Sequence, residues 1–162
     1  MSFTKPKHEW KDDDYMTPKY AWEDIVEFIP KDKEIWESFY GDGQSKKFLN
    51  ELGFKNVIHE KIDFFKENRG EIIVSNPPFS KSKEVLTRCV ELGKPFILIM
   101  PVSKMSTQYF KKIFKDEEKV QIILPKKRIA FIKNGVQTKS ASFECYYYCW
   151  KMNLEKDITQ LY

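Results

Sequence analysis

The stretch Ile72-Ile73-Val74-Ser75-Asn76-Pro77-Pro78-Phe79-Ser80 joins a short apolar run to a stiff polar turn. The apolar run at 72–75 predicts a buried strand, because branched side chains suit a sheet covered on both faces. The two prolines fix their own φ angles and restrict the residue before them, so the chain leaves the strand in one direction. Ser80 suits the start of a helix that runs to Leu92 and ends at Gly93. This order is typical of an α/β domain with a parallel sheet.

The same alternation of apolar runs and helical patterns extends in both directions from this unit. The run 96–100 is the most apolar and predicts a central strand. Thr17 and Pro18 suit the N-cap and first position of a helix, whereas 62–65 fits either a strand or the turn before a helix. The other expected strands span 34–39, 57–59, 120–124 and 142–150, and the other expected helices span 17–29, 44–52 and 108–115.

Length and composition indicate an ordinary folded domain. The 162 residues fit one domain, and 41% hydrophobic with 15% aromatic residues is too much for a disordered chain. No apolar run approaches the ~20 residues that a membrane-spanning helix needs, so no membrane association is expected. We expect one domain over residues 15–152, a flexible arm at 1–14 that does not resemble a signal peptide, and a C-terminal tail at 153–162.

Cysteine and histidine usage excludes several classes of protein. Cys89, Cys145 and Cys149 show no paired spacing, which indicates reduced thiols and a cytoplasmic location, or a host-cell interior if a phage encodes the chain. His8 and His59 have no partner at zinc spacing, so no metal site is expected. No nucleophile elbow accompanies His59, which argues against a Ser-His-Asp hydrolase.

Charge is distributed unevenly along the chain, whose net charge is +4. Residues 104–139 hold ten lysines or arginines and three acids, a balance of +7 that leaves −3 for the rest. This basic segment fits a polyanion bound at one edge, or a solvated lysine-rich face. Lys126, Lys127 and Arg128 follow a predicted strand, so they are candidates to hold nucleic-acid phosphates without reading sequence.

A second polar turn, Glu37-Ser38-Phe39-Tyr40-Gly41-Asp42-Gly43, lies where a strand gives way to a helix. Its glycines let the backbone turn sharply and approach a ligand closely, and ligands of open α/β sheets bind outside the carboxyl ends of the strands. Lys46 stands where a dinucleotide site would have its third glycine. The turn therefore fits an ordinary strand–helix connection as well as a ligand loop.

Together the two turns resemble those of the S-adenosylmethionine-dependent amino-methyltransferases, especially the N6-adenine methyltransferases. That family carries Asn-Pro-Pro-Phe after a strand, as residues 76–79 do here, and a loop of acid, proline, phenylalanine, any residue, glycine, any residue, glycine. Ser38 replaces the proline, and the matching residues are Glu37, Phe39, Gly41 and Gly43. The resemblance implies a Rossmann-like methyltransferase fold, with a mostly parallel sheet, helices on both faces and an antiparallel C-terminal strand.

The resemblance also implies a catalytic set at the first turn, formed by Asn76, Pro77, Pro78 and Phe79. An aromatic exocyclic amine is a poor nucleophile because its lone pair is delocalised into the ring. The Asn76 side-chain oxygen and the Pro77 carbonyl would accept the two amine hydrogens, and fixed acceptors of this kind contribute roughly 3 kcal/mol or more. Phe79 would stack on the base, worth about 1–3 kcal/mol. A base inside a duplex must first be flipped out.

The implied cofactor is S-adenosylmethionine. Residues 15–18, Tyr-Met-Thr-Pro, resemble the N-terminal cofactor motif of the family, with packing and N-capping as alternatives. Glu60 is the candidate for the ribose hydroxyls, with a surface acid as the alternative. Asp63 is the candidate for the adenine amine and Phe64 or Phe65 for its ring, with core packing as the alternative for the phenylalanines. The glycine loop would pass under the methionine part, with Glu37 acting through loop amides or water. The candidate cofactor contacts are Tyr15, Thr17, Glu37, Phe39, Gly41, Gly43, Glu60, Asp63 and Phe64.

Only a dozen residues follow Trp150, so no separate target-recognition domain is expected. Recognition would come from residues 125–139, from a second copy in a homodimer, or from a separate target-recognition subunit. The expected reaction is methyl transfer to an exocyclic amine of a nucleobase, with adenine N6 in DNA placed first. The alternatives are RNA adenine or guanine, a protein glutamine amide, and a catalytically silent fold that binds nucleic acid or a partner.

Overall fold

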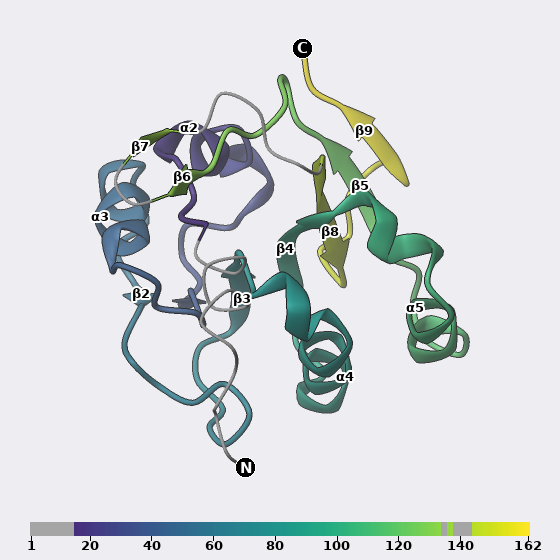
Figure 1. The fold of residues 1–162 in the computed structure, drawn as a ribbon. Helices are drawn as coiled ribbons and strands as arrows, with labels where there is room; N and C mark the ends of the chain where they lie inside the picture. Colours follow the sequence, from purple (N-terminus) through teal and green to yellow (C-terminus); the bar gives the residue numbers. More distant parts are fainter. Residues whose placement is uncertain (1–14, 134–135, 138–143) are drawn as a thin grey trace.

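A seven-stranded sheet forms the centre of the computed structural model, which describes residues 15–133, 136–137 and 144–162 (Figure 1). In spatial order its strands are β2 (Val57–Ile58), β1 (Ile35–Trp36), β3 (Ile72–Ser75), β4 (Phe96–Pro101), β8 (Cys145–Trp150), β5 (Gln121–Leu124) and β9 (Ile158–Gln160). The first four are parallel, β8 runs antiparallel between β4 and β5, and β9 is parallel to β5. The arm expected at 1–14 lies outside the described residues.

This strand order is that of a Rossmann-like methyltransferase fold and confirms the predicted fold class. From β1 the chain moves to β2 on one side and then to β3 on the other side. The carboxyl ends of β1 and β3 therefore meet at the switch point, where open α/β sheets bind their ligands. The antiparallel strand implied by the resemblance is β8, which lies inside the sheet, with β5 and β9 beyond it.

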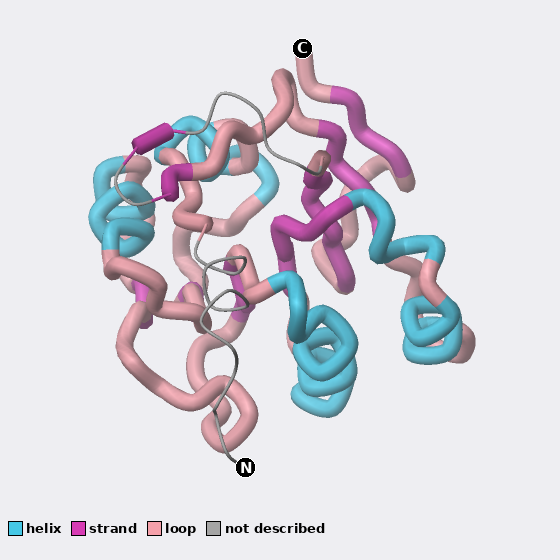
Figure 2. Tube along the Cα trace, viewed as in Figure 1, coloured by secondary structure: helices cyan, strands magenta, loops and turns pink. Residues whose placement is uncertain are grey.

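Helices cover both faces of the sheet (Figures 1 and 2). The helices α2 (Lys19–Glu23) and α3 (Gln44–Glu51) cover one face, and α4 (Ser82–Leu92) and α5 (Gln108–Phe114) cover the other. In β4, Ile97 and Ile99 join the first core cluster, whereas Leu98 and Met100 join the second, because side chains alternate along a strand. Every residue of β4 is buried, as expected for the central strand. Within the described part of the chain, no helix has the length and apolar character to cross a bilayer.

The N-terminal helix is shorter than its periodicity predicts. Residues 17–29 form α2 and a separate 3-10 helix, η1 (Val26–Phe28). The N-cap of α2 is Pro18, with no side-chain capping bond, so the prediction of Thr17 as N-cap is wrong and Thr17 is buried instead. The apolar face of the segment remains buried, and its Trp22 Nε1 donates a 3.2 Å hydrogen bond to Ser45 Oγ on α3.

Two other segments differ from the sequence interpretation. Residues 62–65 form a turn that is followed by irregular chain up to β3, and the Phe65 N–H donates to Asp63 Oδ1 at 2.9 Å. The 3-10 helix η2 (Phe79–Lys81) precedes α4, so the N-cap of α4 is Lys81 and the prediction of Ser80 is wrong. The predicted end of α4 at Gly93 is confirmed by a left-handed φ of 65°.

The aromatic strand β8 packs on both faces of the sheet. Tyr147 and Cys149 belong to one core cluster, and Tyr148 and Trp150 belong to the other. The Tyr147 hydroxyl donates a 2.6 Å hydrogen bond to the Ala21 carbonyl, so its polar tip is satisfied inside the protein. These rings are core residues and are not a platform for stacked bases.

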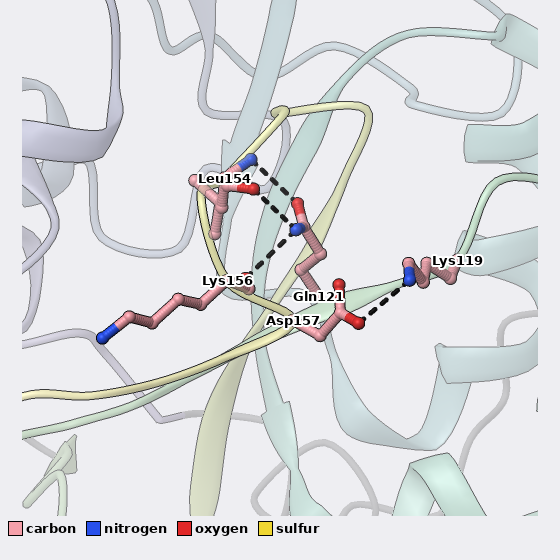
Figure 3. A network of polar contacts seen from close by, with 5 residues as sticks. All are labelled: Lys119, Gln121, Leu154, Lys156 and Asp157. Atoms are coloured by element: carbon pink, nitrogen blue, oxygen red, sulfur yellow. Dashed lines mark hydrogen bonds and ion pairs between the residues drawn. The ribbon is translucent and has the colours of Figure 1, made fainter.

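The residues after Trp150 join the sheet through β9 rather than forming a free tail. Figure 3 shows how Gln121, at the start of β5, holds this segment. Gln121 Nε2 donates to the Leu154 and Lys156 carbonyls at 2.9 and 3.1 Å, and the Leu154 N–H donates to Gln121 Oε1 at 2.9 Å. Lys119 Nζ pairs with Asp157 at 2.9 Å beside this contact.

The basic segment after β5 returns to the N-terminal part of the chain. It contains a hairpin of β6 (Ile132–Lys133) and β7 (Val136–Gln137), while 134–135 and 138–143 lie outside the described residues. Met16 and Ile132 form an antiparallel bridge with two 2.8 Å backbone hydrogen bonds. This pairing brings residues 131–133 beside the segment that precedes α2.

Candidate active site at the carboxyl ends of β1, β2 and β3

Asn76 follows β3 directly and is oriented by the N-terminal segment. Its Nδ2 donates a 2.9 Å hydrogen bond to the Tyr15 carbonyl. A carbonyl oxygen only accepts, so this bond fixes which end of the amide carries the hydrogens. The other end, Asn76 Oδ1, is buried and has no hydrogen-bond partner among the described residues. The structure therefore holds an acceptor oxygen in a fixed position with its bonding capacity unused.

The two prolines and the short helix η2 stiffen the turn after Asn76. The Pro78 carbonyl accepts from the Lys81 N–H at 3.0 Å, and the Phe79 carbonyl accepts from Ser82 Oγ at 2.8 Å. Among the described residues no backbone N–H donates to the Pro77 carbonyl. The Phe79 side chain is 9% exposed, and its ring meets the Phe131 ring edge-on at 6.0 Å. Within the described part of the chain, the turn thus offers Asn76 Oδ1 without a donor and the Pro77 carbonyl without a backbone donor, beside a ring that is mostly covered.

Residues 131–133, which belong to the segment 125–139 that the sequence offered for target recognition, pack beside this turn together with Tyr15. The Tyr15 and Phe131 rings lie edge-on at 6.1 Å. Lys133 Nζ lies 4.7 Å from the centre of the Tyr15 ring and 3.5 Å from the Tyr15 hydroxyl. Because Asn76 binds the Tyr15 carbonyl, the Asn76 turn, Tyr15 and residues 131–133 form one assembly. No local pattern in residues 131–133 predicts that they lie beside the Asn76 turn, because their position depends on the pairing of Met16 with Ile132.

Glu37 links the ends of β1 and β3 from inside the protein. Its side chain is 2% exposed, and Glu37 Oε1 accepts from Ser75 Oγ and, at 3.3 Å, from the Phe39 N–H. Burial raises the pKa of Glu37 to about 8, although hydrogen bonds from Ser75, Phe39 and Ser45 act in the opposite direction. Glu37 is therefore mainly protonated at neutral pH. Its position suits a role in holding the loop, which agrees with the expected indirect action.

The glycine loop meets the N-terminal segment at Gly41. Gly41 has a φ of 56°, and a Cβ added there would lie 2.7 Å from Met16 Sδ. Gly43 has a φ of 82°, and a Cβ there would lie 2.6 Å from the Tyr40 hydroxyl. The left-handed conformation favours glycine at both positions, and the chain lies close enough there for an added Cβ to displace the ends of the Met16 and Tyr40 side chains. The loop and the segment 15–18, two parts of the predicted cofactor site, are thus brought together.

Buried polar atoms without partners gather at the ends of three adjacent strands. Four such side-chain atoms occur in the described part of the chain: Trp36 Nε1, Ser38 Oγ, His59 Nε2 and Asn76 Oδ1. Ser38 comes two residues after the end of β1, and His59 and Asn76 come directly after β2 and β3. Buried polar groups are nearly always paired in proteins, so an unpaired set at the ligand-binding edge of this fold indicates groups that pair with a ligand. Sequence reasoning gave no role to Ser38 or His59.

The remaining predicted cofactor residues lie around the end of β2. Glu60 is exposed and pairs with Arg69, with 3.8 Å between Glu60 Oε2 and an Arg69 nitrogen. Asp63 is exposed and closes its own turn. Phe64 is buried, and its ring lies 5.3 Å from Trp36 and 5.2 Å from Phe39. The alternative of core packing therefore describes Phe64 well.

The predicted phosphate-binding residues Lys126, Lys127 and Arg128 are exposed on the segment that leads from β5 to Phe131. Lys126 Nζ lies 3.9 Å from Asp24, and Lys127 Nζ lies 4.4 Å from the centre of the Tyr20 ring. Tyr20 also holds this segment, because its hydroxyl accepts from the Ala130 N–H at 2.7 Å. The three cations thus share a segment with the cover of the Asn76 turn.

Comparison with known proteins gives little beyond this geometry. No model of a known protein family matches the chain, and no curated protein matches it. Among solved structures, the tRNA (m1A58) methyltransferase TrmI from Aquifex aeolicus is similar over 83% of this chain and 69% of its own, with 13% sequence identity and a TM-score of 0.44. The fold assignment rests on the strand order and the antiparallel β8 described above.

Proposed function

We propose that the protein is an S-adenosylmethionine-dependent methyltransferase that methylates an exocyclic amine of a nucleobase, with adenine N6 in DNA as its acceptor. The observation that carries this proposal is Asn76 Oδ1, a buried acceptor to which no described residue donates, at the switch point of the sheet. An acceptor in this state costs stability unless a ligand supplies the missing hydrogen. The amine of the target base is a donor of the required kind.

Two acceptors on one rigid turn suit the activation of such an amine. Asn76 Oδ1 accepts one amine hydrogen and the Pro77 carbonyl accepts the other. Both bonds draw the nitrogen out of conjugation and aim its lone pair, so the turn contributes orientation and electrostatic preorganisation. The bound cofactor supplies an electrophilic methyl carbon. The methylated nitrogen is cationic and acidic, so it loses its extra proton to water without a dedicated base.

The chain offers a fitting place for the cofactor at the same edge of the sheet. The glycine loop after β1 begins at the buried, protonated Glu37, and Ser38 Oγ beside it has no protein partner among the described residues. Gly41 lets the loop pass closely against Met16. Glu37 would position the loop, while Ser38 and loop backbone groups would contact the cofactor.

Access to Asn76 requires movement of its cover. Asn76 Oδ1 is closed off from solvent, the Tyr15 carbonyl binds the other end of the same amide, and Phe131 packs against the rings of Tyr15 and Phe79. A flipped base therefore reaches this oxygen by displacing the cover. Lys126, Lys127 and Arg128 lie on the same segment as the cover, so phosphate binding there favours the displacement. This coupling suits a nucleic-acid acceptor better than a protein amide.

A product assay tests the proposal. The protein is incubated with labelled S-adenosylmethionine and matched DNA, RNA and protein panels, which are then digested to identify the methylated product. N6-methyladenine in DNA supports the proposal, methylated RNA would move the acceptor to RNA, and no product with no cofactor binding would support a silent fold.

Variants of Asn76 connect the reaction to the residue. Asn76→Ala is expected to lower methyl transfer by at least about a hundredfold, because one oriented acceptor is lost, while calorimetry finds cofactor binding nearly unchanged. Asn68→Ala, at an exposed asparagine in the loop before β3, is the matched control and should keep full activity. Equal loss of transfer and cofactor binding in Asn76→Ala would contradict the assigned role.

A further inference from the structure

His59, directly after β2, has one ring nitrogen bound by the protein and the other unused. The side chain is 5% exposed, and Nδ1 lies 2.9 Å from the Glu37 carbonyl oxygen. A carbonyl cannot donate, so Nδ1 carries the hydrogen. In the neutral ring Nε2 is then a bare acceptor, and it is buried without a hydrogen-bond partner among the described residues.

The surroundings keep the ring neutral and fix its plane. Burial lowers the pKa of His59, while the carbonyls of Glu37 and Tyr40 and the charge of Asp42 oppose this shift and Lys46 reinforces it. The ring stacks on Tyr40, with centroids 4.9 Å apart and planes inclined by 20°. The hydrogen bond and the stacking contact together hold Nε2 in one position.

A neutral, buried acceptor at this place is suited to a neutral hydrogen-bond donor, such as a hydroxyl. Glu60, the acid that the sequence favours for the ribose hydroxyls, is exposed and pairs with Arg69. His59 stands one residue earlier, is buried, and contacts Glu37 at the start of the glycine loop. The geometry therefore favours His59 over Glu60 as the polar group that faces a ligand at the end of β2.

We infer that His59 Nε2 accepts a hydrogen bond from a ribose hydroxyl of the bound cofactor, a role that the sequence gave to Glu60. This inference rests on the proposed function, since it assumes S-adenosylmethionine as the ligand. It also explains the link to the glycine loop: the Glu37 carbonyl selects the tautomer that leaves Nε2 free to accept.

Calorimetry with S-adenosylhomocysteine and its 2′-deoxy and 3′-deoxy analogues tests the inference. His59→Phe keeps a ring to stack on Tyr40 but removes both nitrogens, and it is expected to bind S-adenosylhomocysteine about tenfold more weakly. Against the analogue that lacks the bonded hydroxyl, His59→Phe and wild type should bind alike. Glu60→Gln, the matched control, should bind all three ligands like wild type.

A spectroscopic readout keeps the test independent of whether His59→Phe folds. The chain has two histidines, so a nitrogen-15 spectrum of the imidazoles is simple, and a His8→Gln variant assigns the signals. The Nε2 signal of His59 should shift on addition of S-adenosylhomocysteine and stay in place with one of the deoxy analogues.

Two results would overturn the inference while leaving the proposed function intact. One is an unmoved Nε2 signal although S-adenosylhomocysteine binds. The other is a His59→Phe variant that loses affinity by the same factor for all three ligands. Failure of the wild-type chain to bind S-adenosylhomocysteine at all would instead refute the cofactor, and with it both proposals.

Discussion

Replacing Glu37 by glutamine is expected to change how the stability of the protein depends on pH. The Glu37 carboxyl is 2% exposed, and burial raises its pKa from 4.5 to about 8. Between these two pH values the folded chain keeps a proton on Glu37 that the unfolded chain has released. The free energy of unfolding of the wild type therefore falls as pH rises through this window, and the loss is complete above about pH 8.

The size of the effect follows from the shift. One pKa unit corresponds to about 1.4 kcal/mol, so the difference between 4.5 and about 8 corresponds to about 5 kcal/mol. This is as large as the whole stability of many domains, which is about 5–15 kcal/mol. Glutamine has nearly the same shape, stays neutral, and can still accept from Ser75 Oγ and the Phe39 N–H. We expect Glu37→Gln to match wild type near pH 4.5 and to be more stable by several kcal/mol, on the order of 5, near pH 8.

Urea unfolding followed by tryptophan fluorescence provides the measurement, since the chain has four tryptophans. The free energy of unfolding is compared between the two proteins across this pH range, so that contributions from all other groups cancel. Glu60→Gln, at an exposed acid, is the control and should follow the wild-type profile. A profile for Glu37→Gln that stays parallel to wild type would mean that Glu37 is ionised in the folded state, and the reasoning would be refuted.

Three further substitutions probe the loop, the basic segment and the C-terminal strand. Gly41→Ala should destabilise the protein by roughly 1–3 kcal/mol, the cost of a left-handed residue, because the end of the Met16 side chain can move away from the added Cβ. Gly93→Ala, with a φ of 65° and open space, is the matched control and should cost the same; a much larger loss in thermal unfolding for Gly41→Ala would contradict this reasoning. Reversing the three charges at 126–128 should weaken DNA binding and flatten the slope of log K against log salt by about 3, and an unchanged slope would exclude this segment from the interface. Gln121→Leu removes three hydrogen bonds to residues 154 and 156 and should cost about 1–3 kcal/mol. Hydrogen exchange should then speed up in β9, and unchanged protection there would show that Gln121 does not hold it.

Much of the fold could be predicted because its signals are local. The run 96–100 is apolar on both faces, and the structure makes it the buried central strand β4. Gly93 ends α4 because glycine readily adopts the left-handed conformation found at helix C-termini, as the sequence predicted. The N-terminal helix failed as a prediction because its apolar spacing continues across 17–29 while the backbone departs from helix between Asp24 and Val26. β9 carries no strand signal of its own, and it forms by pairing with residues 122–124 of β5, which lie far away in the sequence.

In the candidate site, too, the local motif could be predicted, whereas its partners from distant parts of the sequence could not. The Asn76 turn could be predicted because its pattern, Asn-Pro-Pro-Phe after a strand, lies in four consecutive residues. The partners that define its chemistry are distant: Tyr15 orients the amide from 61 residues away, and residues 131–133 arrive through the pairing of Ile132 with Met16. The choice between His59 and Glu60 depends on burial and on one carbonyl, neither of which adjacent positions in a sequence reveal.

The unpaired atoms at the three strand ends argue for a ligand more strongly than any one motif does. Leaving a buried polar group unpaired costs about 1–3 kcal/mol, whereas an apolar residue of similar shape is nearly neutral. A chain selected for folding alone would therefore gain stability by replacing Ser38, His59 and Asn76. The three lie at the ends of adjacent parallel strands, and two of them, His59 and Asn76, are held in place by hydrogen bonds through their other polar atom. This loss of stability recurs at neighbouring positions, on side chains that are already held in place. Such preorganisation is typical of a binding site, because side chains that are ordered before the ligand binds lose less conformational entropy on binding.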